Sequence, residues 1–346
     1  MKIKNIFFVS ILISISLSLL SACNSTSASN EESVNIATNP TGQGYNGAGT
    51  GIAEVLYSNS DMMVSIRPYT GPISWMHIFQ NEQEVNQGFL SLPEAVWAYN
   101  GENVFDESDN VRALVKGNFN VSGGYVVRQD SGINSLKDLK GKKVATDYPG
   151  NPIVNDILSA DLNSVGLSFG DVEAVPTSDP NAGLQALREG RVDAAFTGSP
   201  LAAGVLELHT NNPIKALPYG DYDATEFDNL PDQVTEELQE FIPGADLTLF
   251  EGGYVEEETI LIRYPTVLIG SSELLSEEEA YNTVKALWEN YEEMHSAHSW
   301  LKSWNPDTMF DPDIGVPYHE GAIKYYKEIG VWNDEAETNQ QKFFNE

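Results

Sequence analysis

Residues 34–56 read VNIATNPTGQGYNGAGTGIAEVL. Residues 34–38 predict a strand, the glycine-rich residues 41–51 predict a loop, and residues 52–56 predict a helix. The same order of strand, loop and helix then recurs along the chain. Alternation of strands and helices favours a parallel sheet with helices on its faces, so this stretch predicts an α/β fold.

Further strands and helices follow this alternation. We expect strands at 62–67, 125–128, 143–146, 172–175, 192–196, 214–217 and 259–263. We expect helices at 73–79, from 93 onward, and at 133–139, 152–165, 182–189 and 200–208. Ser276 and Glu279 fit a capping box, and apolar residues then recur from Ala280 to Met294 at helical spacing.

The length of the chain predicts two lobes, because 346 residues exceed the size at which one core usually keeps growing. Residues 123–254 contain enough strands and helices for one α/β lobe. Residues 34–122 and 255–346 together make the other lobe. The strand at 259–263 suits a hinge that crosses between the two.

The N-terminus predicts export and a lipid anchor. Lys2 and Lys4 precede an apolar run too short to span a membrane, and Leu20-Ser21-Ala22-Cys23 resembles a bacterial lipobox. The resemblance implies that the signal peptide, residues 1–22, is removed and that Cys23, the sole cysteine, is acylated. Residues 23–33 would then hold the anchor and a polar, flexible tether. The alternative is a buried free cysteine behind an ordinary signal peptide.

The charge of the mature chain excludes one class of partner. Removal of residues 1–22 leaves 17 basic against 51 acidic residues, a net charge of −34. Such a surface repels polyanions, and no basic stripe offsets the repulsion, so we expect no binding to nucleic acid. Contact with the membrane would depend on the acyl anchor.

Four motifs resemble the TAXI family, the solute-binding proteins of tripartite ATP-independent periplasmic (TRAP) transporters. They are the glycine-rich segment 42–53, the segment LKDLKGKKV at 136–144, the segment 192–200, and the sequence PYHEGAIKYYKEIG at 317–330. Together they extend over most of residues 34–332. The chain departs from the family pattern at residues 72–76 and 150–152, so the solute of a relative does not transfer to it.

The resemblance implies a two-lobed, type II-like periplasmic-binding-protein fold with a hinge and a central ligand cleft. It implies capture of a small organic solute, with a carboxylate or amino acid favoured, and delivery to the integral membrane permease of a TRAP transporter. The protein would be an extracytoplasmic, membrane-anchored monomer without a cofactor, and it would not be an enzyme. The alternatives are a sensing lipoprotein that feeds a receptor, a surface hydrolase, and an aromatic cage for a quaternary ammonium compound.

The site is expected in the loops that follow the strands, since ligands of open α/β sheets bind outside the carboxyl ends of strands, beside helix N-termini. Candidate ligand-binding residues in those loops are Tyr45, Asn46, Thr70, Ser74, Trp75, Ser91, Tyr148, Gly150, Asn151 and Thr197. Arg67 is the nearest candidate for an ion pair with a solute, although a structural salt bridge is favoured for it and for Arg263. His295 and His298 beside Glu292 have only ordinary helical spacing, so no metal site is expected.

Overall fold

The computed structural model describes residues 33–81, 84–220 and 222–344. The residues from Ser33 onward form one compact unit. The signal peptide, Cys23 and residues 24–32 of the tether lie outside the described residues. Among the described helices, none has both the length and the apolar character that crossing a membrane requires.

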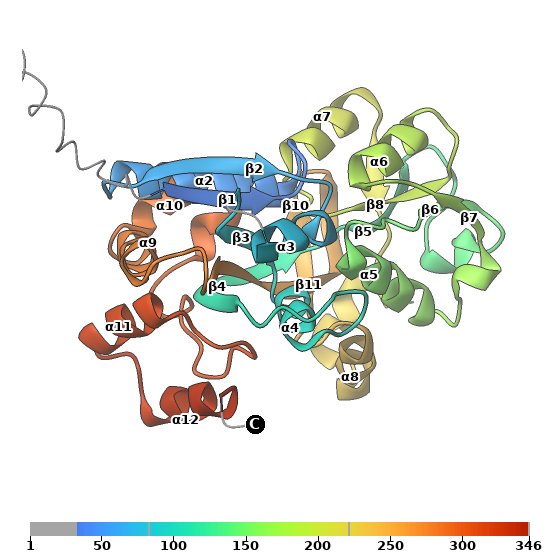
Figure 1. Ribbon diagram of the computed structural model, residues 1–346. Coiled ribbons are helices and arrows are strands. Elements are labelled where there is room, and N and C mark those ends of the chain that lie inside the picture. The colour runs from blue at the N-terminus through green and yellow to red at the C-terminus, as the bar shows by residue number, and fades with distance from the viewer. Residues whose placement is uncertain (1–32, 82–83, 221, 345–346) are drawn as a thin grey trace, which may run out of the picture. The chain divides into compact units, whose positions relative to one another are not determined.

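The first sheet has a parallel centre and an antiparallel side (Figure 1). Its strand order is β10-β11-β3-β1-β2, and β4 also pairs with β11. Strand β1 pairs in parallel with β2 and β3, whereas β11 pairs antiparallel with β3, β4 and β10. The strands are β1 (Ser33–Thr38), β2 (Met63–Pro68), β3 (Gln87–Ser91), β4 (Val111–Val121), β10 (Asp246–Gly252) and β11 (Val255–Ser271).

The second sheet repeats this arrangement. Its order is β7-β6-β8-β5-β9, with β6 parallel to β7 and β8, and with β5 antiparallel to β8 and β9. The strands are β5 (Gly124–Arg128), β6 (Lys143–Thr146), β7 (Glu173–Pro176), β8 (Ala194–Thr197) and β9 (Ile214–Ala216). Both sheets are therefore mixed, because each parallel core accepts an antiparallel strand at one side.

Helices follow most of the strands. They are α2 (Gly44–Ser58), α3 (Pro72–Asn81), α4 (Leu92–Asn100), α5 (Pro152–Asn163), α6 (Pro180–Arg188), α7 (Ala203–Asn211), α8 (Asp232–Phe241), α9 (Glu277–Glu289), α10 (Tyr291–Ala297), α11 (Glu320–Glu328) and α12 (Asp334–Lys342). Short 3₁₀ turns are η1 (Leu136–Leu139), η2 (Phe169–Asp171), η3 (Ala224–Asn229) and η4 (Ser299–Ser303). The capping box of Ser276 and Glu279 is confirmed at the start of α9.

The expected loop at 41–51 is wrong, because α2 already begins at Gly44. The glycines serve close packing there. A Cβ atom on Gly44 would collide with the Trp300 indole, and one on Gly47 would lie 2.7 Å from Nε2 of His298. Gly51 follows on the same face and lies against Leu301. Glycine thus lets α2 approach α10 and η4 closely, a reason that sequence alone does not distinguish from a flexible loop.

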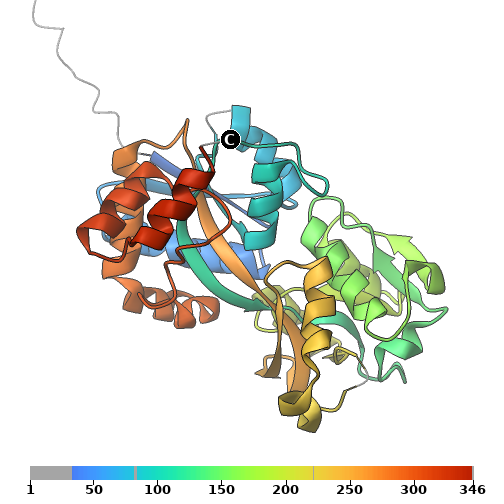
Figure 2. The ribbon, with the colours of Figure 1, turned by 90° about the horizontal axis from the view of Figure 1, so that it is seen from below.

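Two long strands connect the parts that carry the two sheets. Strands β4 and β11 lie side by side, as Figure 2 shows, and β5 of the second sheet begins only three residues after β4 ends. The chain returns through β10, which pairs with β11 in the first sheet. The strands and α-helices that the sequence pattern does not predict are β3, β4, β10, α8 and α12.

Candidate functional site

Loops that follow strands of the two sheets touch one another. The Nδ2 group of Asn151, at the start of α5, donates to the carbonyl of Thr70 at 2.6 Å. Its Oδ1 atom accepts a hydrogen bond from Nδ2 of Asn39 at 2.9 Å. The amide of Ile73 donates to the carbonyl of Gly150 at 3.3 Å. The carboxyl ends of β1, β2 and β6 therefore face each other across a short polar contact.

Helix starts make further contacts between the same two parts. The amide of Gly204 donates to the carbonyl of Gly42 at 3.2 Å, and the side chains of Gln43 and Asn181 form a hydrogen bond. The indole N–H of Trp300 in η4 donates to the Ser199 hydroxyl. These contacts hold the same two parts together beside the facing loops.

A buried polar cluster lies at this junction, and we call Tyr45, Glu94, Asn120 and Tyr264 the inner cluster. Nδ2 of Asn120 donates to the Tyr264 hydroxyl at 2.8 Å, but its Oδ1 atom has no partner among the described residues. The Tyr45 hydroxyl has Tyr264 and Asn120 as polar neighbours. It nevertheless has no hydrogen bond of acceptable geometry with any described residue.

Glu94 is the charged member of the inner cluster, and its side chain is only 1% exposed. Ser91 caps α4 by accepting a hydrogen bond from the Glu94 amide, and its hydroxyl donates to Oε2 of Glu94 at 2.7 Å. Oε1 accepts a long hydrogen bond, 3.4 Å, from the amide of Ile153 in α5. Burial raises the pKa of Glu94 to about 7, against the opposing effect of these hydrogen bonds.

A second buried carboxyl, Asp161, lies where the chain passes from β4 to β5. It accepts a hydrogen bond from the backbone of Tyr125, while its Oδ2 atom has no partner among the described residues. Burial raises the pKa of Asp161 to about 8. Gly124 adjoins it with a left-handed φ of +57°, and a Cβ atom there would lie 2.5 Å from Oδ2.

The sequence-predicted site residues divide into three groups. Thr70, Gly150 and Asn151 lie in the facing loops, and Tyr45 and Ser91 belong to or support the inner cluster. Trp75 packs against Phe79 and Gly88 and is fully buried. The others make local bonds or line a groove: Asn46 donates to Thr38, Tyr148 accepts from the amide of Phe196, Thr197 bonds Tyr254, and the Ser74 hydroxyl donates to the carbonyl of Gly71.

An open groove of about 800 Å³ lies between these loops and α6. It is lined by Pro40, Thr41, Pro68, Tyr69, Thr70, Ser74, Asp179, Asn181, Ala182 and Gln185. Its walls therefore come from loops of the first sheet and from a helix of the second. The groove therefore opens beside the hydrogen bond between Asn151 and Thr70.

A family of known proteins has the same sequence pattern. The NMT1-like family matches residues 36–330, most of the chain. The chain belongs to the NMT1-like family. The mixed sheets with the order described above give this NMT1-like protein the type II periplasmic-binding-protein fold.

Solved structures resemble it at low sequence identity. A protein of Bordetella bronchiseptica is 16% identical with a TM-score of 0.50, over 90% of this chain and 98% of that one. PhnD1 from Prochlorococcus marinus, in complex with methylphosphonate, is 12% identical with a TM-score of 0.49, over 90% and 100%. The periplasmic aliphatic sulphonate binding protein SsuA from Escherichia coli is 15% identical with a TM-score of 0.46, over 90% and 85%. These likenesses concern the fold alone.

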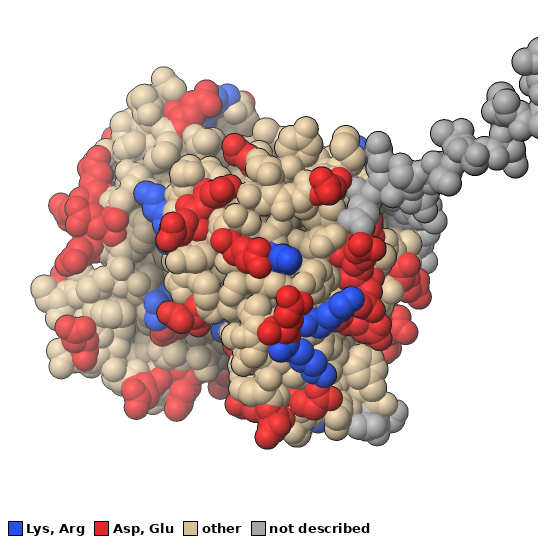
Figure 3. All heavy atoms as spheres, turned by 90° about the vertical axis from the view of Figure 1, so that its left-hand side faces the viewer, with Lys and Arg blue, Asp and Glu red and all other residues tan. Residues whose placement is uncertain are grey.

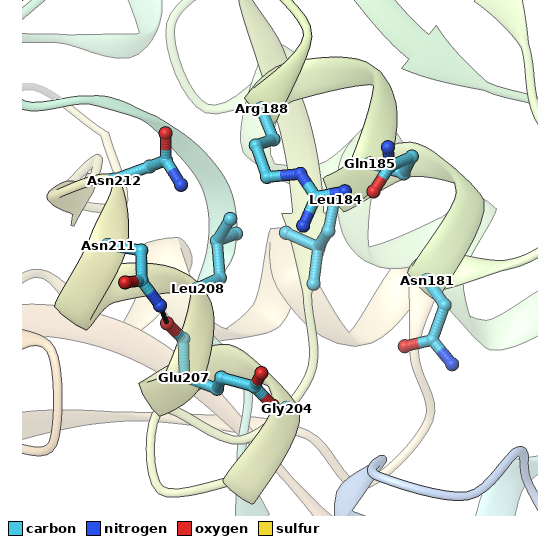
Figure 4. A pocket seen from close by; sticks show the side chains of 9 residues that line it. All are labelled: Asn181, Leu184, Gln185, Arg188, Gly204, Glu207, Leu208, Asn211 and Asn212. Atoms are coloured by element: carbon cyan, nitrogen blue, oxygen red, sulfur yellow. Dashed lines mark hydrogen bonds between the residues drawn. The ribbon is translucent and has the colours of Figure 1, made fainter.

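A smaller pocket of about 190 Å³ lies between α6 and α7 of the NMT1-like protein (Figure 4). Arg188 points into it from α6, opposite Leu208 and Asn211 of α7. Asn181 and Gln185 line both this pocket and the larger groove, so the two hollows adjoin on α6. No sequence-predicted site residue lines the smaller pocket.

Charged groups outside the junction have structural partners. Arg263 pairs with Asp246 and lies over the Phe119 ring at 4.8 Å, as expected for a structural ion pair. Arg67 donates to Oδ1 of Asn35 at 3.3 Å. The face that carries α9 and α11 shows many acidic side chains with a few basic ones among them (Figure 3). No group of metal-ligating side chains occurs among the residues that the structure describes.

Sequence reasoning missed part of the inner cluster. The sequence pattern gives Glu94 no role beyond the start of the helix expected from residue 93 onward, and Asn120 lies in a strand that the pattern does not predict. Tyr264 lies in β11, beyond the 259–263 strand expected to form the hinge. The available signal was weak: an acidic residue three positions after Ser91 is the ordinary pattern of a capping box, and only the tertiary structure brings it against α5.

Proposed function

We propose that the protein is an extracytoplasmic, lipid-anchored solute-binding subunit of a transporter, and that it captures a small organic solute by hinge closure. One observation supports this proposal most: where the loops of the two sheets meet, buried polar atoms have no hydrogen-bond partner among the described residues. Buried polar groups are normally hydrogen-bonded, and an unpaired group costs about 1–3 kcal/mol. A solute that satisfied the Tyr45 hydroxyl and Oδ1 of Asn120 would remove that cost.

The two sheets would belong to two lobes that move about the connecting strands. The hinge would lie where β4 passes into β5 and where β11 crosses, since these strands join the two parts through few backbone positions. Opening would break the contacts of Asn151 with Thr70 and Asn39 and would expose the inner cluster to solvent. Closure around a solute would restore them, as in other hinged binding proteins.

The transporter class follows from the sequence resemblance. We propose TAXI-type delivery to the integral permease of a TRAP transporter, with acylated Cys23 holding the protein at the membrane. A tether of residues 24–33 would raise the local concentration of the binding protein near the permease. Binding would involve no covalent chemistry and no cofactor.

Solute capture is tested with the full chain purified in mild detergent. Thermal unfolding is measured with organic acids, amino acids, amines, sulfonates and phosphonates, and hits are followed by calorimetry and small-angle scattering. We expect at least one compound to raise the unfolding midpoint and to reduce the radius of gyration. If no compound does either, the proposal of a solute-binding function fails.

The anchor and the transporter class need separate measurements. Mass spectrometry of protein from an exporting bacterial host should find Cys23 at the N-terminus with acyl chains, and Cys23→Ala should remain unprocessed and non-acylated. A gene for a large TRAP permease beside this gene supports the TRAP assignment. A neighbouring ATP-binding transporter subunit or a sensor kinase would contradict it.

A further inference from the structure

The electrostatic environment of Glu94 points to the charge of the solute. Among the described residues, no Lys or Arg is buried, and no ion pair involves Glu94. The other carboxyl that acts on it is Asp156, in the second turn of α5, whose negative charge raises the pKa of Glu94 further. A carboxylate, sulfonate or phosphonate placed beside Glu94 would meet repulsion with no neighbouring cation to offset it. A cation would be attracted.

The hydrogen-bonding groups of the inner cluster are acceptors. Among the residues that the structure describes, Oε1 of Glu94 has only the long bond from Ile153, and Oδ1 of Asn120 is unpaired. The Tyr45 hydroxyl, which can accept as well as donate, lies near Tyr264 and Asn120 without a well-formed hydrogen bond to any described residue. A primary ammonium group carries three N–H donors and no acceptor, so it matches three such acceptors. A quaternary ammonium group carries no N–H donor and would leave them unsatisfied.

Aromatic rings pack around Tyr45 of the inner cluster. The Tyr45 ring lies 5.2 Å from the rings of both Phe89 and Trp300, in edge-on arrangements. Burial raises the pKa of Tyr264 in β11 well above its ordinary value, and the negative charge of Glu94 raises it further. Aromatic faces near a carboxylate stabilise a partly desolvated cation. Of the aromatic cage that the sequence suggests, Tyr45, Tyr69, Trp75 and Tyr148, Tyr45 belongs to this set, whereas Trp75 and Tyr148 pack elsewhere.

We propose that the inner cluster binds the primary ammonium group of the solute, with Glu94 as its counter-ion and Asn120 and Tyr45 as further acceptors. The inference rests on the proposed solute-binding function and assigns the solute to the amines or amino acids. A negatively charged group of an amino acid would lie toward the helix N-termini of the facing loops, away from Glu94.

The test compares matched compounds on the full chain. Calorimetry measures L-glutamate against glutarate, γ-aminobutyrate against butyrate, and putrescine against 1,4-butanediol, with choline as the quaternary probe. We expect an amine-bearing compound to bind at least ten-fold more tightly than its partner without nitrogen. Glu94→Gln, which keeps the size and the bond to Ser91, should remove that preference, whereas the exposed Glu102→Gln should retain it.

The remaining outcomes overturn the inference in distinguishable ways. Equal or tighter binding of the compound without nitrogen, tightest binding of choline, or an unchanged preference in Glu94→Gln contradicts ammonium recognition by this cluster. Binding only of organic acids, sulfonates or phosphonates contradicts it as well and leaves the proposed solute-binding function standing. Failure of every compound to bind overturns both. The wild-type comparison needs no variant, so it decides even if Glu94→Gln is unstable.

Discussion

Glu94 and Asp161 are both buried carboxyls with raised pKa values, but their surroundings differ. Glu94 lies between loops that meet through a few side-chain bonds, and three of its neighbours are polar side chains from other elements. Asp161 lies against backbone at the passage from β4 to β5, where Gly124 leaves no space for a side chain. In the proposed function the first region opens and is refilled by a solute, whereas the tight packing of the second holds the chain crossing in place. Burial alone therefore does not identify a binding group.

Gly124→Ala should have the largest effect, because it breaks the tightly packed region. The left-handed φ of +57° disfavours any Cβ atom, and this one would lie 2.5 Å from Oδ2 of Asp161. We expect a loss of about 3 kcal/mol in the free energy of unfolding, the sum of backbone strain and overpacking. Denaturant unfolding measures it. Gly132→Ala is the matched control, with φ +75° and nothing within 4 Å, and should lose only about 1 kcal/mol. Equal losses would contradict the packing argument.

The pH dependence of stability should separate the two carboxyls. Because their folded-state pKa values are raised, the folded protein keeps protons that the unfolded chain has lost, and the free energy of unfolding falls as pH rises. The fall extends from about pH 4 through the folded pKa values, about 7 for Glu94 and about 8 for Asp161.

Asp161→Asn should remove more of this pH dependence than Glu94→Gln, since Asp161 has fewer donors and the higher pKa. The difference between wild type and Asp161→Asn should change by on the order of 4 kcal/mol from pH 5 to pH 9, because about three pH units lie between pH 5 and the folded pKa of about 8. Thermal unfolding at a series of pH values measures it. A slope unchanged in Asp161→Asn would show that this carboxyl is ionised in the folded protein.

Two tyrosines allow a more conservative comparison. The hydroxyls of Tyr45 and Tyr125 are both buried without a partner among the described residues, one beside Glu94 and the other near Asp161. Replacement of either by Phe should change the free energy of unfolding by less than about 1 kcal/mol, since no hydrogen bond is lost. Tyr45→Phe should weaken binding of the best solute about five-fold, whereas Tyr125→Phe should not. Equal losses of solute affinity in Tyr45→Phe and Tyr125→Phe would contradict the placement of Tyr45, rather than Tyr125, in the solute site.

The smallest effect is expected at the exposed rim of the facing loops. Nδ2 of Asn103 donates to Oδ2 of Asp156 at 3.0 Å, and the residue has a left-handed φ of +54°. Asn103→Gly keeps that backbone conformation and removes the bond. We expect a change in stability below about 0.5 kcal/mol and solute affinity within about two-fold of wild type, because water replaces an exposed hydrogen bond. A large loss of affinity would extend the site to this rim.

Much of the fold was predictable because its signals are local. The strands at 34–38 and 143–146 and the capping box of Ser276 depend on short patterns of apolar and capping residues, and the structure confirms them. The long strand β4 was missed, since its sequence mixes polar and apolar residues without a clear period. The sequence pattern places the start of α2 too late, because glycine-rich segments are typical of loops. Only the tertiary structure shows that these glycines pack against α10 and η4.

The site was predictable only as a region. The rule that ligands lie beyond the carboxyl ends of strands led to the loops around Thr70 and Asn151, which do meet in the structure. It did not lead to Glu94, Asn120 or Tyr264, since their importance comes from neighbours 26 to 219 positions apart in the chain. Trp75 and Tyr148 lie in the expected segments, yet their rings pack on Gly88 and Phe196.

By itself, the sequence determined the order of strands and helices, the acidic surface and the expected export of the chain, because these depend on composition and on contacts between near neighbours. The tertiary structure decided which polar groups are buried away from solvent. That choice depends on how α4, α5, β4 and β11 converge, and no local pattern encodes the convergence. An acidic cap residue, a strand asparagine and two tyrosines become a candidate site only when distant segments bury them together.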